Sequence, residues 1–187
     1  MPKGKSAKGK TKTPKAMDAI AMLKADHKKV AGLFEDYEKG RAKKVDIAKT
    51  ICLELLVHTT IEEEILYPAC KGVVEEDMLD EAYVEHDGAK MMIAELEEGT
   101  PVEPFYDAKV KVLSEEIKHH VKEEEQPGGL FAQLRQSDVD LVALGAALKA
   151  RKDELMATMK GAKLPMPMTR TMKGADVRYG TVAERAP

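Results

Sequence analysis

The chain has 187 residues, of which 43% are hydrophobic, 34% charged and 4% aromatic. These values predict one soluble domain with enough apolar residues for a core. Charged residues interrupt every apolar run, which excludes a transmembrane helix, and the basic start lacks the apolar stretch of a secretory signal. Ala, Leu, Lys, Glu and Met are frequent, so we expect helices throughout.

Charge is distributed unevenly along the chain. Residues 1–16 contain six Lys and no acidic residue, so the net charge of −3 becomes −9 for the remainder. We interpret residues 1–13 as a disordered basic arm. Such an arm can touch nucleic acid or another acidic surface, but it has no aromatic residues, and nucleic acid is not the expected partner. A membrane partner is not expected either, and the oligomeric state stays open.

The two cysteines indicate a reducing location. Cys52 and Cys70 fall near opposite ends of one predicted helix, roughly 27 Å apart at 1.5 Å per residue, which is too far for a disulfide. A cytoplasmic protein is the simplest interpretation.

Five helices are predicted in chain order. Thr13 and Pro14 resemble a helix start, and Gly40 and Gly99 resemble helix ends. Ser137 with Asp140 resembles a capping box that starts the last helix. The predicted helices span residues 14–39, 46–69, 77–98, 104–125 and 137–160. We assign residues 14–135 to a four-helix bundle, 136–160 to a C-terminal packing helix, and 161–187 to a poorly ordered tail.

Each of the first four helices has a histidine where its apolar stripe calls for an apolar residue. Short connections make successive helices antiparallel neighbours, so the histidines should converge on one layer. A lone histidine in such a stripe is more often a hydrogen-bonded core residue than a metal ligand, and the set therefore matters more than any member. The four histidines are His27, His58, His86 and His120.

Two of these histidines are followed four residues later by a glutamate. Residues four apart stack on one helix face, so Glu62 lies with His58, and Glu124 lies with His120, on the apolar side. A buried carboxylate costs several kcal/mol unless it is paired or bound to metal. Two such pairs on parallel helices indicate a site for two metal ions about 3.5–4 Å apart, and imidazole suits Fe, Zn and Cu.

These residues resemble the hemerythrin-like HHE cation-binding family. Its pattern is a lone His, His-x3-Glu followed by Leu-Tyr-Pro, another lone His and a final His-x3-Glu, and residues 18–135 fit it. The resemblance implies an antiparallel up-down-up-down four-helix bundle, and with the C-terminal helix predicted above the expected fold class is all-α. It also implies two non-haem Fe ions with a bridging oxo or hydroxo group and two bridging glutamates. Family members bind or sense oxygen, nitric oxide or iron, so the expected partner is a small diatomic ligand such as O2 or NO. The implied metal ligands are His27, His58, Glu62, His86, His120 and Glu124.

The sequence departs from the best-known hemerythrins at three places. Lys90 stands where they have a fifth histidine, and His120-x3-Glu124 replaces His-x4-Asp. Residues 127–129 contain a two-residue excess. Without the fifth histidine the centre should be more open, which argues against simple reversible oxygen carriage. We expect the Lys90 ammonium to reach solvent or to pair with a carboxylate.

Other interpretations remain open at this stage. The centre could belong to a di-iron enzyme such as an oxidase, a peroxidase or an iron-centre repair factor, although ferritin-like oxidases show Glu-x-x-His instead. A purely structural bundle is a third possibility. We expect His119 at the rim or the surface. Tyr37 and Tyr67 should serve mainly in packing, with hydrogen bonding near the centre as the lesser alternative. We expect the Met-rich stretch 156–172 in packing or disorder rather than copper binding. The remaining acidic neighbours should be mostly solvated, with outer-shell roles as the lesser alternative: Glu63, Glu64, Glu123 and Glu125.

Overall fold

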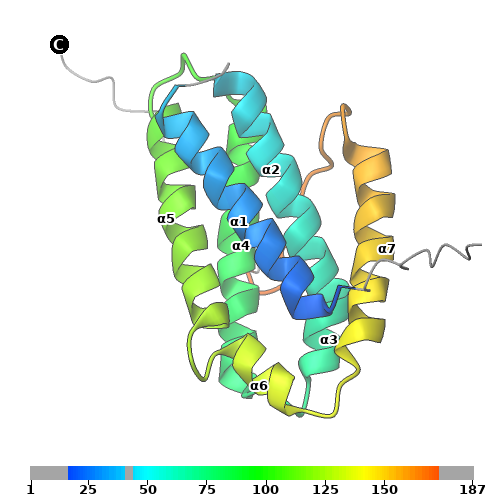
Figure 1. The fold of residues 1–187 in the computed structure, drawn as a ribbon. Coiled ribbons are helices and arrows are strands. Elements are labelled where there is room, and N and C mark those ends of the chain that lie inside the picture. The colour runs from blue at the N-terminus through cyan, green and yellow to red at the C-terminus, as the bar shows by residue number, and fades with distance from the viewer. Residues whose placement is uncertain (1–16, 41–43, 173–187) are drawn as a thin grey trace, which may run out of the picture.

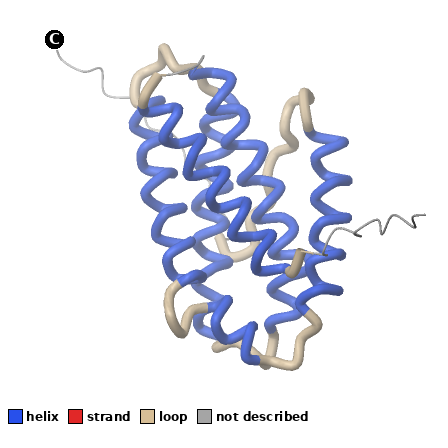
Figure 2. The backbone as a smooth tube through the Cα atoms, in the orientation of Figure 1, coloured by secondary structure: helices blue, strands red, loops and turns tan. Residues whose placement is uncertain are grey.

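The computed structural model describes residues 17–40 and 44–172. Figures 1 and 2 show an all-helical protein, with no strand in those ranges, which confirms the predicted fold class. No helix within these ranges is both long and apolar enough to cross a bilayer. The elements are α1 (Ala19–Glu38), α2 (Lys44–Ile61), the π-helix η1 (Glu62–Leu66), α3 (Tyr67–Cys70), α4 (Glu76–Glu98), α5 (Tyr106–Glu125), α6 (Leu130–Gln136) and α7 (Leu141–Met159).

Four long helices form the bundle. Contacts join α1 to α2, α2 to α4, α4 to α5, and α5 back to α1, which closes a ring of neighbours. Figure 1 shows α6 across the lower end and α7 beside α2, outside the ring. Helix α7 packs against α1, α2 and η1. The predicted up-down-up-down order follows from the short connections between successive helices.

The apolar core is divided into two clusters along the bundle. One cluster includes Leu23 of α1, Ile61 of α2 and Leu134 of α6. The other includes Phe34 of α1 and Ile93 of α4. Along their helices, His27 and His86 lie between residues of one cluster and residues of the other. His58 and His120 follow the last residue that their helices contribute to the second cluster. The fold therefore encloses a polar layer between two apolar layers, which limits access of water to it.

Several helix boundaries differ from the predicted ones. Helix α1 starts at Ala19, because the Asp18 side chain accepts a 2.8 Å hydrogen bond from the Ala21 N–H and caps it. The predicted start at residues 13 and 14 lies outside the described residues. Helix α7 starts after Asp140, whose side chain accepts from two N–H groups, and not at Ser137. The Ser137 hydroxyl instead donates to the Leu134 carbonyl at the end of α6.

The segment after α7 lies against the bundle, although we predicted it as part of a poorly ordered tail. Figure 1 shows it turning back at the end of α7 and passing behind the bundle. Asp87 Oδ2 of α4 accepts hydrogen bonds from the Arg170 and Thr171 N–H groups and from the Thr171 hydroxyl. Leu164 is buried in the core. Backbone donors satisfying a buried carboxylate leave no hydrophobic pattern, so the sequence did not predict this contact. Residues 173–187 lie outside the described part.

We expect Gly145→Ala to destabilise the protein. A Cβ at Gly145 would lie 2.6 Å from the Met17 carbonyl oxygen and 2.8 Å from the Ala19 nitrogen, so α7 would have to move away from α1. Overpacking of this kind costs about 1–3 kcal/mol, and we expect thermal unfolding to show a melting temperature lower by several degrees.

Gly32→Ala is the matched control, because a Cβ at this exposed position of α1 meets nothing within 4 Å. It should raise stability by about 0.5–1 kcal/mol, since Ala is the better helix former. Equal melting temperatures for the two variants would contradict the close approach of α7 to α1.

Candidate metal centre

The six side chains predicted as metal ligands meet in the polar layer. Helices α1, α2, α4 and α5 each contribute one histidine, and none of the four is more than 7% exposed. Glu62 opens η1 and Glu124 lies in the last turn of α5; their exposures are 0% and 2%. The structure thus brings together all of the residues that the sequence assigned to this site: His27, His58, Glu62, His86, His120 and Glu124.

The four histidines form two pairs through their inner ring nitrogens. Nε2 of His27 lies 3.1 Å from Nε2 of His58. Nε2 of His86 lies 3.3 Å from Nε2 of His120. Two imidazole nitrogens that converge in this way present lone pairs to a common point, which is the arrangement that holds a transition-metal ion.

The two glutamates lie between the histidine pairs. Glu62 Oε2 is 3.2 Å from His58 Nε2 and 3.4 Å from His86 Nε2. Glu124 Oε2 is 3.3 Å from His27 Nε2, and its Oε1 is 3.7 Å from His120 Nε2. Each carboxylate therefore touches one histidine of each pair, so each can bridge two metal positions.

The oxygens of both glutamates are buried without hydrogen bonds. Neither oxygen of Glu62 and neither oxygen of Glu124 has a hydrogen-bond partner. Leaving a carboxylate in this state costs several kcal/mol, and a bound cation removes that cost. Ligand atoms of His27, His58 and Glu62, and those of Glu62, His86 and His120, lie within 4.8 Å of one another. The residues present therefore fit a pair of metal ions.

The pKa values reflect the same burial. Burial and the neighbouring Glu124 carboxylate raise the pKa of Glu62 well above its usual value. Burial alone would also raise the pKa of Glu124, but the nearby His120 and His27 imidazoles hold it below its usual value. Burial and the adjacent imidazoles lower the pKa of His86, which favours the neutral ring that binds metals.

Comparison with known proteins agrees with this geometry. The sequence matches the hemerythrin HHE cation binding domain over residues 18–127, which is more than half of the chain. The chain belongs to this family. The match includes all six residues of the layer and ends near the close of α5.

Two individual proteins resemble this HHE domain. A hemerythrin HHE cation binding domain-containing protein from Mycobacterium kansasii has a similar solved structure, with a TM-score of 0.63, 22% identity, and coverage of 75% of this chain and 88% of that one. At this identity the likeness shows the fold alone. A protein named DNA nickase, from Nostoc sp. strain PCC 7120, is 26% identical over 149 residues, or 78% of this chain. The match spans 42% of that relative's length.

Each of the four histidines at the centre of the HHE domain also has its outer nitrogen near a carboxylate from the neighbouring helix. We call these four acidic residues the carboxylate ring. Each is adjacent in sequence to a predicted ligand, but it contacts the histidine of the next helix, so the contacts run from α1 to α2, α4, α5 and back to α1. The contacts are Asp26 to His58 (3.7 Å), Glu63 to His86 (3.1 Å), Glu85 to His120 (2.7 Å) and Glu125 to His27 (2.8 Å), all at Nδ1.

A carboxylate on the outer nitrogen orients a metal-binding imidazole and makes it more basic. Lysines neutralise three members of the ring. Lys152 of α7 lies 2.5 Å from Asp26, Lys90 2.5 Å from Glu63, and Lys24 2.9 Å from Glu125. Among the described residues Glu85 has no Lys or Arg partner.

The prediction that Glu63 and Glu125 are mostly solvated was wrong. Glu63 is 7% exposed and contacts His86 and Lys90, and Glu125 contacts His27 and Lys24. The sequence analysis did not single out the other two ring members at all. Their one visible signal is the presence of an acid next to each predicted ligand, which is common on a helix with many charges.

The π-helix η1 explains how two consecutive glutamates are both buried. In an α-helix, consecutive side chains point about 100° apart. Here the Tyr67 N–H donates to the Glu62 carbonyl five residues back, so the turn is wider. Pro68 has no N–H and cannot continue the regular ladder at the next position. The wider turn lets Glu62 face the centre while Glu63 faces His86, and π turns often occur at functional sites.

Lys90 and Tyr67 both lie near His86 at the centre. Lys90 stands at the fifth-histidine position, but its buried ammonium pairs with Glu63, as one of the two expected outcomes stated. Tyr67 is fully buried, and its Oη lies 3.0 Å from His86 Nε2. The tyrosine therefore places a hydroxyl at the centre, beyond the packing role that we expected.

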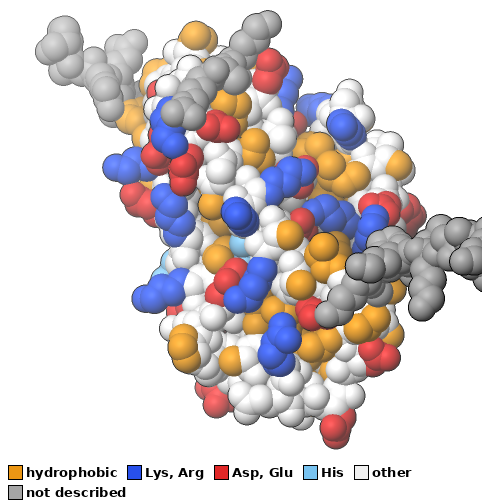
Figure 3. Space-filling view, in the orientation of Figure 1, with side chains coloured by type: hydrophobic (Ala, Val, Ile, Leu, Met, Phe, Trp, Pro, Cys, Tyr) orange, Lys and Arg blue, Asp and Glu red, His pale blue; other side chains and the backbone are white. Residues whose placement is uncertain are grey.

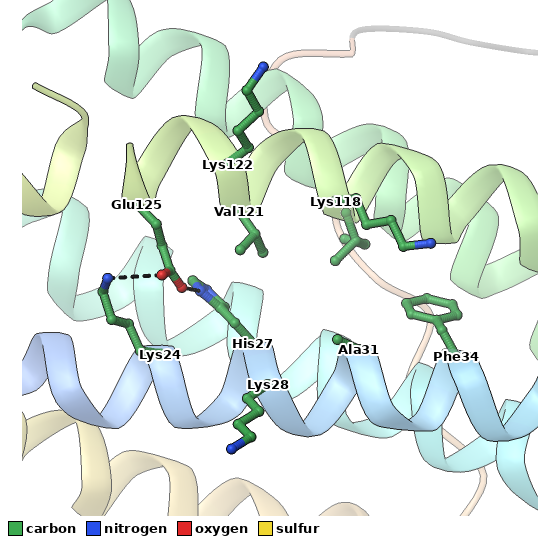
Figure 4. A pocket seen from close by; sticks show the side chains of 10 residues that line it. Lys24, His27, Lys28, Ala31, Phe34, Lys118, Val121, Lys122 and Glu125 are labelled. Atoms are coloured by element: carbon green, nitrogen blue, oxygen red, sulfur yellow. Dashed lines mark hydrogen bonds and ion pairs between the residues drawn. The ribbon is translucent and has the colours of Figure 1, made fainter. Parts of the chain in front are cut away.

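A groove on the outside of the bundle reaches His27. It has a volume of about 550 Å³ and lies between α1 and α5, with Ala31, Phe34 and Val121 among its apolar residues. Figure 4 shows Lys24 and His27 both directed at Glu125. Four lysines line the groove, and Figure 3 shows Lys and Arg side chains spread over this face. The groove is thus positively charged, which disfavours entry of a metal cation.

We expect Glu62→Gln to separate metal binding from folding. The amide keeps the shape and cannot carry the charge that burial disfavours at this position, so the metal-free variant should melt at or above the temperature of the metal-free wild type. The same variant should bind at most one metal ion, because a neutral amide cannot bridge two cations. Metal analysis and thermal unfolding measure both effects.

Glu64→Gln is the matched control, because Glu64 is on the same helix but pairs with Arg151 at the surface. It should leave the metal content unchanged. Full metal content in Glu62→Gln would show that this carboxylate is not a shared ligand.

Glu63→Ala should destabilise the protein by about 3 kcal/mol, because it removes the closest carboxylate from the buried Lys90 ammonium and leaves only Asp87 Oδ1, at 3.5 Å, to pair with it. Denaturant unfolding of the metal-free protein measures this cost. The double variant Glu63→Ala/Lys90→Met removes the stranded charge and should recover most of the loss. A single variant as stable as the wild type would contradict the buried pair.

Proposed function

We propose that this HHE domain is a non-haem di-iron protein that binds or senses oxygen, nitric oxide or iron. The observation that carries the proposal is the set of four buried carboxylate oxygens that make no hydrogen bond and lie between two histidine pairs. A purely structural bundle gives no reason to keep Glu62 and Glu124 in this place, since apolar residues of similar volume would be at least as stable.

The two metal positions follow from the pairs. His27 and His58 would hold one ion, and His86 and His120 the other. Glu62 and Glu124 would be shared, because each touches a histidine of both pairs. A mixed set of imidazoles and carboxylates suits iron, and iron bound here would supply an exchangeable position for a small ligand.

The carboxylate ring supports a positively charged centre. Two divalent ions bring four positive charges, and the shared glutamates return two negative ones. Neutral imidazoles add no charge, so the two ions with their six ligands would keep a net positive charge. Carboxylates near the outer nitrogens offset this charge from a short distance. Hydrogen bonds at Nδ1 fix the rings of His27, His86 and His120 with Nε2 directed inward.

A di-iron enzyme such as an oxidase, a peroxidase or an iron-centre repair factor is the second candidate. The observation that favours it is the Tyr67 hydroxyl, which lies 3.0 Å from His86 Nε2 inside the centre. A hydroxyl in this place can donate a hydrogen bond or a proton to a molecule bound at the second metal position. Lys90 would not be a ligand at that position, because its ammonium pairs with Glu63.

The experiment that tests the proposal is metal analysis of the anaerobically reconstituted protein, followed by mixing with oxygen. We expect about two Fe per chain and a new visible band on mixing. A band that reverses when oxygen is removed supports binding or sensing. Steady consumption of hydrogen peroxide supports the enzyme. Less than about one transition-metal ion per chain after reconstitution would overturn both.

We also propose a cytoplasmic location. The described thiols of Cys52 and Cys70 are buried and unbridged, which agrees with the predicted cytoplasmic location. We do not extend the DNA-nicking activity in the name of the Nostoc relative to this chain, because more than half of that relative lies outside the match. The basic arm, the one segment predicted to contact nucleic acid, lies outside the described residues.

A further inference from the structure

Glu85 differs from the other members of the carboxylate ring. The outer side of Asp26, Glu63 and Glu125 is neutralised by a lysine. Glu85 uses Oε2 to accept from His120 Nδ1, and its Oε1 lies 3.5 Å from the surface residue His119. Within the described ranges no lysine or arginine pairs with it. The ring thus lacks a cation at this one position.

Around Glu85 lies a second set of metal-binding side chains. Glu81 and Glu85 are four residues apart on α4, and His119 and Glu123 are four residues apart on α5. The two pairs face each other across neighbouring helices, and ligand atoms of all four lie within 4.8 Å of one another. His119 Nε2 is 3.2 Å from Glu123 Oε1. The cluster holds three carboxylates and, in the described chain, no lysine or arginine that pairs with them.

A cavity lined by the three carboxylates of this cluster reaches the buried centre. It has a volume of about 210 Å³, and its lining includes Glu81, Glu85 and Glu123 together with His120 and Glu124. Glu124 is 2% exposed, and both of its oxygens lack hydrogen-bond partners. The cavity thus brings surface carboxylates and an unpartnered buried carboxylate to the same space.

We propose that Glu81, Glu85, His119 and Glu123 form a third, peripheral site for a divalent transition-metal ion, at which Fe²⁺ is captured on its way to the centre. One imidazole and three carboxylates suit such an ion. The bound ion supplies the positive charge that lysines supply to the other ring members. The loading role rests on the proposed di-iron function, whereas the existence of the peripheral site does not.

The charges of the two sides of α5 favour this route. The groove between α1 and α5 also reaches His27, but four lysines line it and repel a cation. The cavity between α4 and α5 is lined by carboxylates. Fields of one sign at a cleft raise the local concentration and on-rate of the opposite ion by about 10- to 1,000-fold. Of these two openings, the cavity between α4 and α5 is therefore the favourable entrance for Fe²⁺.

Co²⁺ titration of the metal-free full-length protein tests the site. We expect about three Co²⁺ per chain by equilibrium dialysis and metal analysis, and about two in His119→Ala/Glu123→Gln. Glu85 is left in place because it also holds His120. Glu115→Gln, which removes an exposed carboxylate elsewhere on α5, is the matched control and should retain three.

The rate of Fe²⁺ uptake at low micromolar concentration tests the loading role. The same double variant should fill the buried centre about tenfold more slowly, yet reach the same final content of two Fe in the centre. Glu115→Gln should load at the wild-type rate. The loading rate is measured under anaerobic conditions from the fall in the concentration of free Fe²⁺. This measurement requires no activity of the loaded protein.

The outcomes separate the proposals. Two Co²⁺ in wild type and double variant alike would overturn the peripheral site and leave the di-iron function intact. Loss of the third Co²⁺ without a change in Fe²⁺ uptake would overturn the loading role alone. No bound metal in any variant would overturn the peripheral site and the proposed function together.

Discussion

Glu62 and Glu124 bring four carboxylate oxygens into the middle of an apolar bundle, where none makes a hydrogen bond. The remainder of the structure can be understood as a consequence of this charge. Apolar clusters above and below the layer limit access of water from both ends of the bundle, so solvent offsets little of this charge. Four inward-facing imidazoles surround the oxygens, and their neutral form provides nitrogen ligands without adding positive charge. A pair of metal ions would satisfy every one of these groups at once.

The carboxylate ring links the position of each helix to that of its neighbour. Asp26 on α1 faces the histidine of α2, and Glu125 on α5 faces the histidine of α1. A rotation of any one helix would disturb both its own histidine and the carboxylate that it offers to the next helix. The ring therefore couples the packing of the bundle to the geometry of the site.

Segments outside the bundle also reach this ring. Helix α7 contributes Lys152, which neutralises Asp26. The segment after α7 places Arg170 3.5 Å from Glu63, and its Met168 carbonyl accepts from Lys90. Residues beyond the four bundle helices thus contact the side chains that surround the centre.

The sequence predicted the features that depend on periodicity. Histidines at apolar positions, with glutamates four residues after two of them, are enough to place six side chains in one layer, because helix geometry fixes which residues share a face. The outer partners were not predictable in the same way. Asp26 and Glu85 lie one residue from a ligand, and which neighbouring helix they face depends on the exact rotation of each helix.

Two other misses have similar physical reasons. Glu63 is buried because η1 widens the helix next to Pro68, and a period of 3.6 residues cannot anticipate that turn. The segment after α7 is held by backbone N–H groups on Asp87, which any sequence could offer. Ser137 and Asp140 both had cap chemistry, and the choice between them depends on where α6 ends.

X-ray absorption at the iron edge of the reconstituted protein tests the central claim most directly. The account predicts two irons per chain about 3.5–4 Å apart, each with two imidazole nitrogens and carboxylate oxygens in its first shell. A spectrum with no iron–iron scattering, or with iron bound only by oxygen, would contradict the assignment of Glu62 and Glu124 as bridges between the two histidine pairs.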